Sequence, residues 1–169
     1  MFRLVSVRRI SFTLAALAVL GLAGPVAAGE QVPFKGSLEG DVTITPLTPP
    51  YLQVDVEATG NATHLGRFSL DIPHQVNRAN GTASGSYEFT AANGDMLFAD
   101  FTGQATPTET PGILYIEETA TITGGTGRFA GATGSFVCKR LLDAATLTST
   151  GSLDGTIRLH DDEDEGDDD

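Results

Sequence analysis

The stretch FKGSLEGDVTIT, residues 34–45, decides the fold class. Apolar residues or glycine occupy every second position, and lysine, serine, threonine or acidic residues fill the positions between them. Successive side chains of a β-strand leave opposite faces of the backbone, so this alternation is typical of a strand with one buried face. Residues 51–58 repeat the pattern, and the rest of the chain after residue 28 follows it without a convincing helical period. The sequence therefore predicts an all-β protein.

Turn residues divide the alternating runs into eight predicted strands. Asn93-Gly94, between two such runs, is the strongest short hairpin signal. Short connections between consecutive strands predict one antiparallel up-and-down sheet. Eight strands are about the number that closes into a barrel, and closure removes the exposed edges of a long sheet. We expect an eight-stranded barrel, with a two-sheet sandwich as the alternative. The predicted strands are 33–45, 51–58, 62–72, 82–91, 95–105, 113–123, 134–141 and 146–158.

The two ends of the chain differ from the predicted barrel domain at 29–159. Residues 1–28 resemble a cleaved signal peptide: Arg8-Arg9 precede an uncharged apolar run, and Val26-Ala27-Ala28 supply the small residues before a cut. We therefore expect a secreted or periplasmic protein, exported by the general or the twin-arginine route. Residues 160–169 form a predicted disordered tail, because eight of the last nine residues are acidic.

The charge of the chain narrows the classes of partner. Without the predicted signal, seven Lys or Arg face 22 Asp or Glu, a net charge of −15. Binding to nucleic acid or to an anionic membrane needs clustered cations, so neither partner is expected. No segment after the signal is apolar and long enough to be a spanning helix. Cys138 is the single cysteine, and we expect it to be buried.

The glycine-rich segment at residues 124–134 is the most distinctive part of the sequence. It lacks the Gly-Lys-Ser/Thr ending of a phosphate-binding loop, and a strand rather than a helix is expected after it. We therefore expect no nucleotide and no other cofactor. The glycines fit a strand-to-strand turn with unusual backbone angles, and Phe129 is expected to close one end of the barrel.

This segment, GGTGRFAGATG, resembles the motif before the penultimate strand of the allene oxide cyclase and dirigent barrel superfamily. Residues 62–68, 90–95 and 118–123 extend the likeness to small exported bacterial proteins of that barrel type with no assigned activity. The resemblance implies an eight-stranded barrel. Allene oxide cyclases close an unsaturated fatty-acid epoxide, and dirigent proteins steer the coupling of phenoxy radicals. No motif here matches the working residues of either family.

Strand phase identifies polar residues on the inner faces of the predicted barrel. His64 is in step with Phe68, and Glu118 and Arg140 are each in step with apolar neighbours. A turn centred near residue 128 or 129 would place Glu118 across from Cys138 or Arg140. One interpretation is a structural Glu118–Arg140 pair, since a buried carboxylate is costly unless it is paired. The other makes Glu118 a general acid or ligand anchor, helped by His64 and Tyr87 at the mouth of the lumen.

Three functions are compatible with these residues. The first is a non-catalytic exported barrel that binds a small apolar or amphipathic molecule in its lumen, through His64, Tyr87, Glu118 and Arg140. The second is a cyclase- or isomerase-like enzyme with Glu118 as its acid. The third is a cell-envelope interaction protein with a filled barrel. His64 and His74 lack the spacing of a metal site and are expected on the surface or rim, and no hydrolase motif is present. Neither the ligand nor the oligomeric state follows from these residues.

Overall fold

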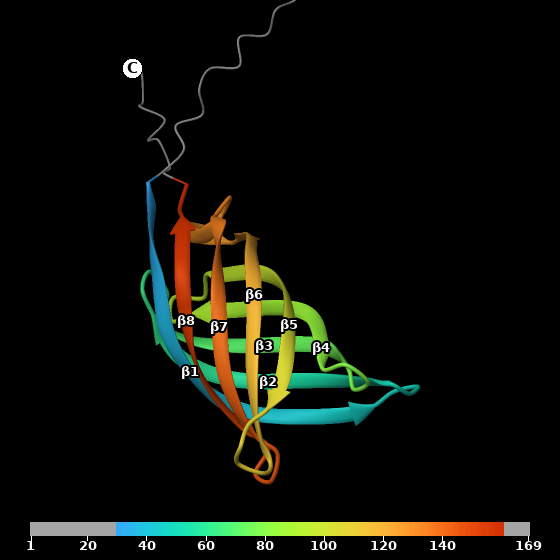
Figure 1. The fold of residues 1–169 in the computed structure, drawn as a ribbon. Helices are drawn as coiled ribbons and strands as arrows, with labels where there is room; N and C mark the ends of the chain where they lie inside the picture. Colours follow the sequence, from blue (N-terminus) through green and yellow to red (C-terminus); the bar gives the residue numbers. More distant parts are fainter. Residues whose placement is uncertain (1–29, 161–169) are drawn as a thin grey trace, which may run out of the picture.

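The computed structural model describes residues 30–160, and the predicted signal peptide and the segment 161–169 lie outside them. The described chain is all-β and forms one closed antiparallel barrel (Figure 1). No helix of this part of the chain is long and apolar enough to cross a membrane. The eight strands are β1 (Gln31–Pro46), β2 (Tyr51–Ala62), β3 (Gly66–Asn77), β4 (Thr82–Ala91), β5 (Met96–Pro107), β6 (Ile113–Gly125), β7 (Thr133–Asp143) and β8 (Thr148–Arg158).

Each strand pairs with the next one along the chain, and β1 closes the barrel against β8. The predicted up-and-down barrel is therefore confirmed, and the sandwich is excluded. β1 is shared between two neighbours: residues 31–41 pair with β8, and residues 36–46 pair with β2. Figure 1 shows β1 bending from a course beside β8 to a course beside β2.

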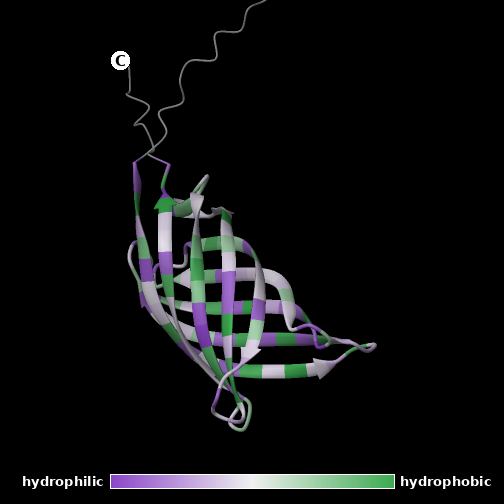
Figure 2. Ribbon diagram, viewed as in Figure 1, coloured by the Kyte–Doolittle hydropathy of each residue, from purple (hydrophilic) through white to green (hydrophobic). Residues whose placement is uncertain are grey.

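The alternation in the sequence becomes an inside and an outside. Figure 2 shows hydrophobic and hydrophilic residues alternating along the strands. Aromatic rings fill the interior: Tyr87 stacks on Phe89 at 5.7 Å, and Phe136 lies 5.3 Å from Phe34 and 5.2 Å from Tyr87, measured between ring centroids. Each aromatic pair of this kind stabilises a core by about 0.5–1.5 kcal/mol beyond its buried area.

Two predicted turns are confirmed. At Asn93-Gly94 the backbone NH of Ala91 donates to the Asp95 carbonyl at 2.9 Å, and Gly94 has a φ of 90°. In the glycine-rich segment, a short 3₁₀ turn at Gly127–Phe129 places the Phe129 side chain inside the barrel with 0% exposure. Phe129 therefore closes this end of the barrel as expected.

The β2–β3 turn lies later in the chain than predicted. Gly60 and Asn61 remain in the strand ladder, whereas the sequence had indicated a turn at 59–61. The reversal falls at residues 63–65, where the backbone NH of Leu65 donates to the Thr63 carbonyl at 2.9 Å and His64 and Gly66 both have a φ of 65°. Left-handed backbone at these two positions breaks the strand phase, and Leu65 rather than His64 is buried.

Candidate functional site

Glu118 lies in the interior of the barrel, where its side chain is 0% exposed. β6 and β7 pair so that Glu118 stands opposite Cys138 and Ile116 stands opposite Arg140. The turn around residues 127–129 sets this register, and of the two predicted cross-strand neighbours of Glu118, Cys138 or Arg140, the structure has Cys138. All four side chains belong to inward-facing positions of their strands.

The Glu118 carboxylate is held on both of its oxygens. Oε1 accepts a hydrogen bond from Arg140 Nη2, and Oε2 accepts from Arg140 Nε at 3.0 Å and from the Tyr87 hydroxyl. Arg140 is 2% exposed, and its Nη1 donates to Ser149 Oγ at 3.4 Å. We call Tyr87, Glu118, Arg140 and Ser149 the interior polar cluster. The predicted Glu118–Arg140 pair is confirmed, and each charged group meets hydrogen-bond partners within the barrel.

Burial sets the protonation of the neighbours of this pair. It raises the pKa of the Tyr87 hydroxyl well above its usual range and the pKa of the Cys138 thiol to about 12. Burial alone would lower the pKa of Arg140, but the Glu118 carboxylate outweighs it and raises that pKa. Cys138 is therefore a neutral thiol near pH 7, and a neutral thiol is a poor nucleophile. Because the cluster is buried and internally paired, its geometry favours a structural role.

The structure corrects two predictions about histidines. Strand phase placed His64 on the inner face at the mouth of the lumen, with the surface or rim as the alternative; it lies in the β2–β3 turn and is exposed, so the inward position is wrong. It is therefore separate from the interior polar cluster.

His74 was expected on the surface or rim, but it is only 6% exposed. Its Nδ1 lies 2.9 Å from the Ile72 carbonyl, its ring lies 5.7 Å from that of Phe101, and burial lowers its pKa. The burial of His74 could have been predicted from Phe68, Leu70 and Ile72, because continuing their two-residue alternation places His74 on the same inner face.

The predicted strand ended at residue 72 because Pro73 follows it. Proline lacks a backbone NH and usually ends a strand or lies at an edge. Here β3 keeps its pairing with β2 through Pro73, whereas its ladder with β4 is interrupted at residues 72 and 73. Among residues 30–160, no three His, Cys, Asp or Glu side chains come together as a possible metal site.

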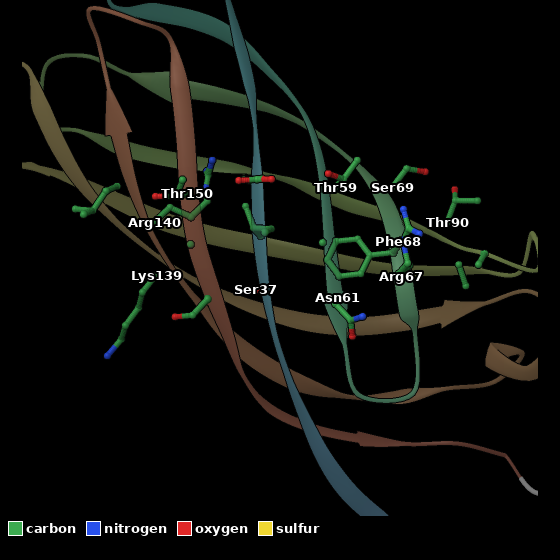
Figure 3. Close-up of a pocket in the computed structure, with 18 of the residues that line it drawn as sticks. Ser37, Thr59, Asn61, Arg67, Phe68, Ser69, Thr90, Lys139, Arg140 and Thr150 are labelled. Atoms are coloured by element: carbon green, nitrogen blue, oxygen red, sulfur yellow. The ribbon is translucent and has the colours of Figure 1, made fainter.

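Sequence reasoning missed an open groove on the outside of the barrel, of about 1350 Å³. Most of its lining residues are outward-facing and exposed, and the buried residues Leu38, Phe68, Ala91 and Arg140 form part of its floor. Figure 3 shows its residues spread over strands on both sides of β1. We call it the outer groove. Its outward-facing lining residues include Ser37, Glu39, Thr59, Asn61, Arg67, Ser69, Thr90, Ala92, Tyr115, Lys139, Leu141, Thr150 and Ser152.

Strand register orders these side chains into two rows across five strands. The first row runs Arg67, Asn61, Ser37, Ser152 and Lys139, each paired with the next.

The second row runs Ser69, Thr59, Glu39, Thr150 and Leu141, and Tyr115 on β6 follows Leu141. Leu141 is 49% exposed and supplies an apolar side chain at this end of the groove. The groove thus combines hydroxyl and amide groups with an apolar end.

The fold and the polar interior place this chain in a class of small closed antiparallel barrels with a buried ion pair. Among solved structures, a pterocarpan synthase dirigent protein is similar, with a TM-score of 0.54 over 88% of this chain and 98% of that chain. The two sequences are 12% identical, so the likeness shows a dirigent-like barrel fold alone. No protein-family model and no curated protein matches the sequence.

Proposed function

We propose that this chain is a small exported barrel that binds an amphipathic molecule without chemically changing it, and that the ligand lies in the outer groove. The observation that carries the proposal is the difference in accessibility between the interior polar cluster and the outer groove. Glu118 of the interior polar cluster is 0% exposed and internally bonded, whereas the outer groove, which Arg140 of the cluster also lines, is open and has both polar and apolar lining.

The buried cluster weighs against an acid-catalysed reaction. A general acid must come within hydrogen-bond reach of its substrate, directly or through one water. Both Glu118 oxygens are already occupied by Arg140 and Tyr87. A lumen ligand would also have to displace the aromatic rings that contact one another there. The predicted ligand-binding roles of Tyr87, Glu118 and Arg140 stay predictions.

The lining of the outer groove supports an amphipathic ligand. Ligand sites are concave and combine apolar contacts with a few polar groups that fix orientation. Here Ser37, Thr59 and Asn61 supply donors and acceptors near the middle, and Leu141 and Tyr115 supply apolar contact at one end.

Dodecyl maltoside below its micelle concentration is a suitable first probe, since it has a neutral hydroxylated head and an apolar chain. A ¹H–¹⁵N NMR titration should shift the amide signals of Ser37, Thr59 and Thr150, and leave those of Glu118 and Cys138 in place. Native mass spectrometry of protein purified from its own host would show a retained natural ligand as an added mass.

A matched pair of variants separates the outer groove from the lumen. Ser37→Trp fills the centre of the groove and should abolish the shifts, whereas Thr121→Trp adds the same ring at an exposed position outside it. Shifts confined to Glu118 and Cys138, unaffected by Ser37→Trp, would overturn the proposal in favour of the lumen.

A further inference from the structure

The charges on this face of the barrel are sorted into two neighbouring hollows. The outer groove holds the exposed cations Arg67 and Lys139 and one carboxylate, Glu39. The adjacent hollow is lined by the carboxylates of Glu39, Asp41, Glu57 and Asp71, and no Lys or Arg lines it. On a chain with an excess of acidic residues, the outer groove is therefore less acidic than the adjacent hollow.

The two exposed cations of the groove differ in their ion pairing. Lys139 has a carboxylate partner, with its Nζ 3.9 Å from Glu117 Oε2. Arg67 makes no ion pair within the part of the chain that the structure describes. Asn61 and Ser69 lie beside it, on the neighbouring strand and two residues along its own strand, and can donate hydrogen bonds to the same acceptor.

Leu141 lies at the end of the groove opposite Arg67, two residues along β7 from Lys139. Arg67 is on β3 and Leu141 on β7, four strand spacings apart through β2, β1 and β8, or about 19 Å around the surface. An extended dodecyl chain with its head group spans most of that distance. The Asp71–Glu57–Asp41 row, with each residue paired to the next, repels an anion placed further along the same strands.

We infer that the ligand of the outer groove is an amphipathic anion, with its carboxylate or similar acidic head at Arg67 and its apolar chain directed toward Leu141 and Tyr115. This inference rests on the proposed function and adds the charge and orientation of the ligand. Arg67 gives the head a guanidinium that can form two parallel hydrogen bonds to a carboxylate.

Three probes that share one chain test the inference: dodecanoate, dodecyl maltoside and dodecyltrimethylammonium, each titrated below its micelle concentration. We expect dodecanoate to bind most tightly and the ammonium probe least tightly. Dodecanoate should shift the Arg67 and Asn61 signals most strongly, and its affinity should fall as salt is added.

Arg67→Gln should weaken dodecanoate binding by about fivefold, the effect of a partly exposed ion pair, and leave dodecyl maltoside binding unchanged. Arg67→Lys keeps the charge and should retain most of the affinity. Arg78→Gln is the matched control, because Arg78 is an exposed arginine that lines a different hollow.

The outcomes separate the two proposals. Equal affinity for the three probes, or tightest binding of the ammonium probe, would overturn the anionic head and leave the groove as the binding site. Absence of any response at groove residues with all three probes would overturn both.

Discussion

Gly103 stands directly opposite Glu118 in the β5–β6 ladder, and a Cβ atom on Gly103 would lie 2.6 Å from Glu118 Cγ. Gly151 has the same relationship with Arg140, where the corresponding distance to Arg140 Cγ is also 2.6 Å. Both members of the buried ion pair therefore lie against a neighbouring strand that carries no side chain at that point. The two glycines provide the space in which the pair forms.

Gly103→Ala should destabilise the fold by about 1–3 kcal/mol, the usual effect of an added methyl group in a filled core. The added carbon would be too close to Glu118 Cγ and would move the carboxylate relative to Arg140. Equilibrium unfolding in urea measures the change.

Thr102→Val is the control, because residue 102 is exposed on the outer face of the same strand. It should change the free energy of unfolding by no more than about 0.5 kcal/mol. Equal effects of the two substitutions would show that the space beside Gly103 is not required.

Replacing both members of the ion pair should cost less stability than replacing one. Glu118→Leu leaves the buried Arg140 guanidinium without its counter-charge, and loss of one partner of a buried pair typically costs about 3–5 kcal/mol. Arg140→Met likewise leaves the buried Glu118 carboxylate without its counter-charge. The double variant removes both charges, so its free energy of unfolding should exceed that of either single variant.

The neighbouring surface pair supplies the comparison for this double-mutant cycle. Glu117 and Lys139 lie on the same two strands as Glu118 and Arg140, and their side chains are about half exposed. Glu117→Leu should change stability by about 0–1 kcal/mol. If Glu118→Leu costs no more than Glu117→Leu, the buried pair does not hold the barrel together.

The interior of the barrel could be predicted from the sequence because it depends on a period of two residues. That period alone places Glu118 and Arg140 inside, and the glycine-rich turn fixes their register. It failed where the chain leaves regular strand geometry: the left-handed residues of the β2–β3 turn moved His64 out, and Pro73 concealed that β3 continues to His74.

The outer groove could not be predicted in this way. Its rows join residues from five strands, so they exist only once every register is set and β1 is bent. Gly40 carried a local signal for the bend, since a Cβ atom there would lie 2.6 Å from Ala58 Cβ on β2. A glycine in an alternating run indicates close approach of a strand, but not which surface becomes concave.

His74 should make the stability of the fold depend on pH below neutrality. Its pKa is lowered from 6.5 by burial, so the unfolded chain binds a proton there more readily than the folded chain does. The contribution of neutral His74 is complete above pH 6.5 and is lost as the pH falls from 6.5 toward the lowered pKa. Urea unfolding between about pH 5 and 7 measures this slope.

His74→Phe should flatten the dependence, since phenylalanine keeps a ring against Phe101 and cannot be protonated. His64→Gln, which replaces an exposed histidine of the β2–β3 turn, is the control variant. A slope that changes with His64→Gln and not with His74→Phe would contradict the assignment.

Cys138 should report unfolding through its reactivity. Only a thiolate reacts rapidly with iodoacetamide, and Cys138 is 0% exposed with a pKa raised by burial to about 12. Native protein should therefore be labelled more slowly than a variant with an exposed cysteine, Thr121→Cys in a Cys138→Ala background, by a factor on the order of 10³ or more. Rapid labelling of the folded wild-type protein would show that the barrel admits reagents to its interior.

The raised pKa of Cys138 also makes the stability of the fold fall at alkaline pH. The contribution of the neutral thiol is complete below pH 9 and is lost as the pH rises toward 12. Cys138→Ala should lose less stability than the wild-type chain over that range.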